Sequence, residues 1–586
     1  LNANTTASNN TAVGEESLGA NTTGTANVAI GYQSLDTNTT GDNNTALGHR
    51  ALDANTTADN NTGVGAFALN SNTTGTQNTS VGVFALDHNT TGSNNTTIGH
   101  SSLGANTTGV SNTSMGSEAL DANTTGDFNT AIGRQALTNN TTADNNTAVG
   151  RAALSANTTG ASLNAVGANA LDANTTGSFN NAFGQNCMGA NTTGHRNTAM
   201  GQDSFQANTT GARNTAVGNS ALAFNTTADN NTAVGNNALV ANTTGASNTA
   251  VGRSALQNNT TASNNTALGK DALASNTTGV NNVAVGSLSL DANTTGFHNT
   301  AVGLQALSAN TTASNNTAVG TNSLLVNTTG TRNVAVGANV LDAATTADDN
   351  TALGFEALTS CTTGSDNTAI GKDALYHNTT GGFNTAVGRD ALTSVTNGTQ
   401  NTGCGANTGF DLTTGASNTC VGSDAGRDLT SGSNNLLLGK NAGRSGSPSG
   451  TVTTGSNNVV LGNDQIQNLF CEDTSISASD SRDKTDISDF NIGLKWIEAL
   501  RPVTYRWDRR TWYGTDEQPY GTPDGSKKRN RLHIGFLAQE ALEVEKTNGF
   551  GDSNDNMLIC NLTEDGMSYG MKYERLVPIL VNAIKE

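Results

Sequence analysis

The segment from Ser479 to Lys484 is the part of the sequence that could do chemistry, because it places a hydroxyl and an amine five residues apart. A serine hydroxyl is a poor nucleophile unless a base lies next to it. A lysine amine can be that base only when it is neutral, which burial favours and a neighbouring carboxylate such as Asp483 opposes. The alternative interpretation is a solvated turn without any chemistry.

Three further motifs follow this segment in order. They read Leu500-Arg-Pro-Val-Thr-Tyr-Arg-Trp507, Arg531-Leu-His-Ile-Gly-Phe-Leu-Ala-Gln-Glu540 and Tyr573-Glu-Arg-Leu-Val-Pro-Ile-Leu-Val-Asn-Ala-Ile584. Together the four motifs resemble the intramolecular chaperone auto-processing family, which is found at the ends of tail spikes, tail fibres and endosialidases. The resemblance covers about residues 479–586 and implies a small α+β domain that aligns three chains.

This resemblance also implies roles for individual residues. Ser479 would be the nucleophile and Lys484 the general base of a single-turnover serine endopeptidase that cuts between Ala478 and Ser479. The small side chain of Ala478 leaves room for the attack. The family often has an apolar residue where this chain has Asp483, which would favour the charged lysine and oppose the cut.

The last segment has the apolar period of an amphipathic helix. Its apolar residues are Leu576, Ile579, Leu580, Ala583 and Ile584. Pro578 is tolerable there only near the start of the helix. In the family such a helix leads into a trimeric coiled coil; since the sequence stops at Glu586, we expect that coil to be absent or very short.

Two other features of this region have plain interpretations. His533 invites a Ser-His pairing, but it lies just before the Gly-Phe-Leu-Ala-Gln motif, where the resemblance implies a core or supporting role. The run Lys527-Lys-Arg-Asn-Arg531 is interpreted as a solvated loop. One short basic run in an acidic chain is a poor footprint for nucleic acid.

The cysteines do not suggest a metal site. They are Cys187, Cys361, Cys404, Cys420, Cys471 and Cys560. None has the close pairing of a zinc site or a redox motif. We therefore expect buried free thiols, since free cysteine behaves as a small hydrophobe, and neither a metal nor a cofactor.

The N-terminal part is dominated by an internal repeat. The motif Asn10-Thr-Ala-Val-Gly14 recurs with its glycine every 17 residues to Gly439, and one more copy ends at Gly462. A large apolar residue recurs in the same register, first as Leu18 and Leu35. Gly and Asn supply turns and interrupt any helix. We predict stacked coils with two short strands each, the Ala-Val and Ala-Leu steps, and Val and Leu in a narrow core.

This repeat resembles the head repeats of trimeric autotransporter adhesins and the Asn-Thr-x-x-Gly repeats of tail-fibre-like proteins. One coil carries about two large apolar groups, too few to offset its ordering entropy. Stacking of coils, and association with neighbouring chains, is therefore expected. The fold class predicted is mainly β: a β-solenoid or β-roll shaft that is homotrimeric, with the small C-terminal domain.

A second motif, Asn-Thr-Thr, has three open interpretations. It begins at Asn4, Asn21, Asn38, Asn55, Asn72 and Asn89 and continues to Asn327, after which Ala344, Cys361 and Leu412 replace Asn in later repeats. An inward Asn would form a hydrogen-bonded ladder that fixes the register. An outward Asn would be a glycosylation acceptor, since Asn-x-Thr is the acceptor sequence. A flat outward Thr face would order water and bind ice.

The composition separates the shaft from the C-terminal part. Only 34% of the 586 residues are hydrophobic and 13% are charged, against roughly 45–50% apolar in ordinary domains. All prolines and tryptophans lie after residue 447. We predict a shaft over residues 1–462, a linker over 463–478 and the chaperone domain over 479–586. The net charge of −19 disfavours nucleic acid, and no apolar run is long enough to span a membrane.

These features favour an extracellular homotrimeric fibre, either a virion tail fibre or a cell-surface filament, that meets a host-cell surface or a glycan receptor. The C-terminal domain would drive trimer assembly and then cut itself off. A glycan-coated or ice-binding matrix filament is one alternative. A fibre-borne polysaccharide hydrolase is another, but no paired carboxylates in a pocket-forming domain are evident. Because the sequence begins inside a repeat at Leu1, we expect an attachment part before it.

Overall fold

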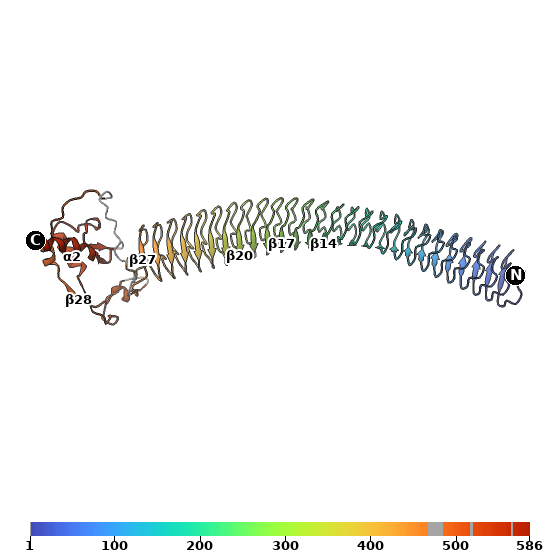
Figure 1. Cartoon of the computed structure of the whole chain (residues 1–586), viewed down its shortest axis with the longest axis horizontal. Helices are drawn as coiled ribbons and strands as arrows, with labels where there is room; N and C mark the ends of the chain where they lie inside the picture. The colour runs from blue at the N-terminus through green and yellow to red at the C-terminus, as the bar shows by residue number, and fades with distance from the viewer. Residues whose placement is uncertain (1, 467–483, 516–517, 519, 564–565) are drawn as a thin grey trace. The chain divides into compact units, whose positions relative to one another are not determined.

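The computed structural model describes residues 2–466, 484–515, 518, 520–563 and 566–586. It divides into two units, Leu1–Thr329 and Gly330–Glu586. In both units the repeats form coils of 17 residues, and Figure 1 shows each coil as a narrow loop with one short strand. The predicted fold class is confirmed: the chain is mainly β, with a parallel β-solenoid and a small α+β part at its C-terminal end.

Each coil contributes one strand of three residues. The first unit contains β1 (Thr11–Val13), β2 (Val28–Ile30), β3 (Thr45–Leu47), β4 (Thr62–Val64), β5 (Thr79–Val81), β6 (Thr96–Ile98), β7 (Thr113–Met115), β8 (Thr130–Ile132), β9 (Thr147–Val149), β10 (Asn164–Val166), β11 (Asn181–Phe183), β12 (Thr198–Met200), β13 (Thr215–Val217), β14 (Thr232–Val234), β15 (Thr249–Val251), β16 (Thr266–Leu268), β17 (Val283–Val285), β18 (Thr300–Val302) and β19 (Thr317–Val319). The second unit contains β20 (Val334–Val336), β21 (Thr351–Leu353), β22 (Thr368–Ile370), β23 (Thr385–Val387), β24 (Thr402–Cys404), β25 (Thr419–Val421), β26 (Leu436–Leu438) and β27 (Val459–Leu461). Within each unit, successive strands pair in parallel and in register, so that Ala12 lies beside Ala29.

The middle residue of each strand points into the coil, and the residues on either side point out. Ala29 and Ala46 are fully buried, whereas Ile30 and Leu47 are 37% and 44% exposed. The prediction that the Val place lies in the core was therefore wrong. Side chains alternate along a strand with a period of two, so a three-residue strand can bury only its central side chain. In this repeat that side chain is usually Ala.

The Ala-Leu step, predicted as a second strand, is a turn. Its leucine is fully buried but has a left-handed backbone, with φ of 53° at Leu35 and 54° at Leu52. The amide of Leu35 still donates to the carbonyl of Ala51 in the next coil at 3.0 Å. The left-handed conformation costs about 1–2 kcal/mol, and burial of the leucine side chain contributes about 2 kcal/mol in return. Packing of the leucine thus outweighs its local preference.

The glycine after each strand lies directly on the glycine of the next coil, as predicted. A Cβ on Gly14 would lie 2.5 Å from the carbonyl oxygen of Gly31, and the φ of Gly14 is +131°. L side chains rarely adopt this backbone conformation. Both the contact and the dihedral explain why this place is glycine in every coil.

Buried asparagines form ladders from coil to coil. Nδ2 of Asn38 donates to Oδ1 of Asn21 at 2.8 Å and to the carbonyl of Gly41 at 3.1 Å. In a second ladder, the backbone N–H of Asn44 donates to Oδ1 of Asn27 at 2.8 Å. These side chains satisfy backbone groups that the turns would otherwise leave unpaired inside the coil.

We expect Asn55→Ala to destabilise its coil by about 3 kcal/mol. The substitution would leave buried groups of Asn38, Asn72 and Ala58 without their partner. Asn378→Ala is the matched control, because the Oδ1 of Asn378 is buried and has no hydrogen-bond partner; its loss should cost less than about 1 kcal/mol. Hydrogen exchange of the surrounding amides would measure both, and equal losses would contradict the ladder's role.

The C-terminal domain is a small α+β fold. Its elements are α1 (Leu494–Ala499), β28 (Val503–Tyr505), η2 (Arg510–Tyr513), β29 (His533–Gly535), α2 (Ala538–Thr547), η3 (Asn554–Asn556), β30 (Cys560–Leu562), β31 (Tyr569–Met571), η4 (Tyr573–Arg575) and α3 (Leu576–Lys585). β28 pairs with β29 and β30 with β31, both antiparallel. Trp496, Leu542, Ile559 and Ile579 lie in its core. The predicted final helix is α3, and Pro578 lies in its first turn, as expected.

Candidate assembly surface and self-cleavage segment

The predicted cleavage residues are only partly within the described structure. Ala478, Ser479 and Asp483 lie outside the described residues. Lys484 is the first described residue after them, and its side chain is exposed. A lysine base has to be shielded from water, so the position of Lys484 in the single chain does not yet have the environment that the chemistry needs.

A buried carboxylate holds the core of the C-terminal domain together. Glu545 of α2 is fully buried, and its Oε1 accepts the backbone N–H groups of Ile559 at 2.6 Å and Cys560 at 2.8 Å. Its Oε2 accepts the N–H of Leu558 at 2.9 Å. Three such bonds fix the start of β30 against α2. The sequence offered no signal for this contact, because one glutamate in a helix forms no pattern.

His533 and the basic run lie where the sequence suggested. His533 is half-buried on β29 and stacks on Tyr505 of β28, with ring centroids 5.5 Å apart. This contact fits a supporting role. Lys527 and Lys528 are exposed in a loop, and the guanidinium of Arg529 lies 4.7 Å from the ring centroid of Trp512.

The Asn-Thr-Thr motif has its asparagine inside the coil. Asn21, Asn38, Asn55, Asn72 and Asn89 are fully buried, whereas Asn4, in the first coil, is exposed and donates to the carbonyl of Ala7. A buried amide cannot carry a glycan in the folded coil. Of the two threonines, Thr22 donates its hydroxyl to the carbonyl of Thr39 at 2.9 Å, while Thr23 is exposed. The geometry therefore has the form of a ladder.

Four of the cysteines are buried, as expected. They are Cys187, Cys361, Cys420 and Cys560, and burial raises the pKa of the Cys187 thiol to about 12. Cys404 is exposed, against the prediction, because it occupies the outward third place of β24. Cys471 lies outside the described residues. Among those that are described, no three His, Cys, Asp or Glu side chains gather in a group that could hold a metal ion.

The outward third residues of the strands form an apolar stripe in each unit. Those at least 36% exposed are Val13, Ile30, Leu47, Val81, Ile98, Met115, Ile132, Phe183, Met200 and Leu268 in the first unit and Leu353, Ile370, Val421 and Leu461 in the second. Monomeric proteins rarely leave a long apolar surface open to water. The sequence interpretation missed this surface, although strand alternation would have found it.

Helix α3 exposes a second apolar surface. Val577, Leu580, Val581 and Ile584 are between 42% and 85% exposed. Their spacing of three, four and seven residues is that of a coiled-coil seam. The opposite side of α3 is occupied, since Leu576 and Ile579 are buried in the core of the domain.

These observations define the class of protein: a β-solenoid shaft followed by a small α+β domain, with apolar surfaces on both, which fits a tail-fibre-like protein. Residues 479–550 match the family described as the chaperone of endosialidase. The match begins at Ser479 and contains the first three of the four motifs, while the motif from Tyr573 lies beyond it. No curated protein and no solved structure matched the chain. Within the described residues, no helix has the length and apolar character needed to cross a bilayer.

Proposed function

We propose that this protein is a fibre of three identical chains whose C-terminal domain directs their assembly. The match of residues 479–550 to a chaperone family supports the second part. The observation that carries the first part is the apolar stripe. Because the stripe recurs once per coil, it is complementary in spacing to the same stripe on an identical chain in register.

A closed assembly around one axis would bury all copies of the stripe together. The seam on α3 would be covered by the same symmetry, since three such helices form a short bundle. The number three comes from the resemblance to the chaperone family, whose domains align three chains. Small assemblies of this kind leave the other sides of each coil open to solvent.

In this proposal the fibre works outside the cell, as a virion tail fibre or a surface filament, and contacts a host surface or a glycan. Its residues support a recognition role in one respect. The inner places of the coil are nearly constant, whereas the exposed corner residues change from coil to coil, for example from Asn60 to Phe128 to Arg196. Variation on a constant scaffold is the arrangement that recognition surfaces use.

Cys404 offers a test of the association surface, because it is the exposed thiol of the stripe. In a chain carrying Cys471→Ser, we expect a short bismaleimide to link Cys404 residues of different chains in high yield. The buried thiols should not react, since burial holds the pKa of Cys420 near 12 and blocks access. Denaturing electrophoresis would show the linked chains, and native mass spectrometry should give three chains.

Two controls sharpen this experiment. Adding Cys404→Ser to the same chain should abolish the linked band. Rapid reaction of Cys404 with a monofunctional maleimide, without linking, would mean that the stripe faces solvent and that another surface joins the chains. A folded, stable monomer by mass would refute the trimer itself.

A further inference from the structure

The coils act as an alignment of the chain with itself. Residues that the coil needs recur in nearly every copy, so a departure confined to consecutive coils is not required by the fold. The corner residue, which lies two places before each strand, is exposed and left-handed, and its identity varies. Phe179, Arg196 and Arg213 are the corner residues before β11, β12 and β13, with φ of 61°, 57° and 58°.

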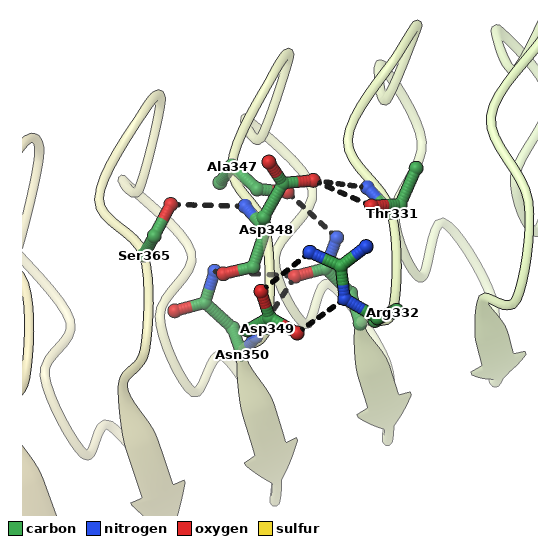
Figure 2. A network of polar contacts seen from close by, with 8 residues as sticks. Thr331, Arg332, Ala347, Asp348, Asp349, Asn350 and Ser365 are labelled. Carbon is green, nitrogen blue, oxygen red and sulfur yellow. Dashed lines mark hydrogen bonds and ion pairs between the residues drawn. The ribbon is translucent and has the colours of Figure 1, made fainter.

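Figure 2 shows how an arginine at this corner is balanced elsewhere in the chain. Arg332, the corner residue before β20, pairs with Asp349, the corner residue of the next coil. Its Nε lies 2.6 Å from Oδ1 and its Nη2 lies 2.7 Å from Oδ2. The neighbouring Asp348 accepts the N–H of Thr331 at 2.6 Å. Each charge at this corner therefore has a partner one coil away.

Arg196 and Arg213 lack this arrangement, because the next-coil neighbour of Arg196 is another arginine. The N–H of Arg196 donates to the carbonyl of Ser178, and that of Arg213 to the carbonyl of His195, both at 3.1 Å, so the corners stack about 5 Å apart. Within the shaft residues that the structure describes, neither guanidinium forms an ion pair with a carboxylate. Two adjacent like charges without a counter-charge destabilise each other.

An aromatic ring and a hollow lie next to this pair. Phe179 is 56% exposed at the corner of the preceding coil. A shallow hollow of about 280 Å³ is lined by Phe179, Arg196, the half-buried His195 and residues of the Thr176–Ser178 turn. An exposed ring beside two guanidinium groups provides an apolar face and two charged donors within three coils.

We propose that Phe179, Arg196 and Arg213 bind a carboxylated polysaccharide. The carboxylate accepts hydrogen bonds from Arg196 and Arg213, and the apolar face of the sugar ring packs on Phe179. The chain as a whole carries a net charge of −19 and repels polyanions. A local cationic place is therefore required if the shaft is to hold an acidic glycan. This inference is independent of how many chains associate.

The test uses the full-length chain and a fluorescent octamer of galacturonate as the probe. We expect saturable binding, and none for the fully methyl-esterified octamer, which keeps the sugars and lacks the charges. Arg196→Gln and Arg213→Gln should each weaken binding roughly tenfold, since each removes a charge-assisted contact. Phe179→Ala should also weaken binding, which loss of simple charge attraction would not explain.

Arg134 and Arg151 provide the matched control. They are exposed in consecutive coils, two residues after β8 and β9, and the places beside them carry Ser117 and Ala168 instead of a ring. The double variant Arg134→Gln/Arg151→Gln changes the net charge as much as Arg196→Gln/Arg213→Gln does. It should alter affinity less than about threefold.

Equal losses from both double variants would overturn the proposal, because binding would then follow net charge alone. Absence of saturable binding, or equal binding of the methyl ester, would also overturn it. All four arginines are exposed, so we expect unchanged circular dichroism spectra in every variant. Native mass spectrometry separates this outcome from a failure of chain association.

Discussion

The substitution Ser479→Ala should leave the chain whole, whereas the unaltered protein should separate into residues 1–478 and 479–586. Without its hydroxyl the site has no nucleophile to attack the Ala478–Ser479 peptide bond. Folding of the domain does not use this hydroxyl, so the variant should still assemble. Mass spectrometry of freshly expressed protein would measure both fragments, and no added protease should be needed, since nucleophile and base belong to one domain.

Lys484→Ala should block the cut as well, because serine without a base remains a poor nucleophile. Ser481→Ala is the matched control, a serine two residues further on that should be replaceable without effect. The carboxylate of Asp483 favours the charged form of the lysine beside it, so we expect cleavage to be slow at neutral pH and faster at higher pH. Because Lys484 is exposed in the single chain, we also expect the cut in assembled protein rather than in isolated chains.

An unaltered protein that stays whole at every pH, with its C-terminal domain folded and assembled, would contradict the self-cleavage hypothesis. The domain would then be an assembly module without enzymatic activity. That result would leave the shaft and its association untouched, since neither depends on Ser479.

The second large effect is expected from Gly150→Ala. A Cβ on Gly150 would lie 2.4 Å from the carbonyl oxygen of Gly167 in the next coil, and the φ of Gly150 is +138°. Backbone strain and overpacking together should destabilise the coil by about 3 kcal/mol or more. Limited proteolysis should then cut the shaft near this coil, where the unaltered shaft resists.

Gly160→Ala is the control for this variant. Its Cβ would lie 2.5 Å from the carbonyl oxygen of Gly177, a contact as close as that at Gly150, but its φ is not in the left-handed range. The chain itself carries alanine at the same place in other coils, as Ala143 and Ala228. We expect little effect. Proteolysis of both variants alike would mean that space, and not the dihedral of the strand glycine, sets the requirement.

The period and the stacking of the coils could be read from the sequence because they depend on local chemistry that repeats without a slip. Gly14 and Gly31 recur at an interval that no helix accommodates, and their stacking was predicted correctly. The C-terminal domain was equally visible, since tryptophans and prolines appear only there and α3 has a clear apolar period. The inward or outward direction of Asn21 remained open, because its sequence motif is compatible with both.

Direction was what only the tertiary structure decided. The sequence interpretation put the Val13 place inside because large apolar side chains usually are inside. The structure puts it outside, since the middle of a three-residue strand faces in and Leu18 already fills the coil from its left-handed turn. The same stacking makes Arg196 a neighbour of Arg213, although 17 residues separate them. Composition and period thus determined that a coil forms, whereas the closure of the coil determined which side chains it leaves for another molecule to contact.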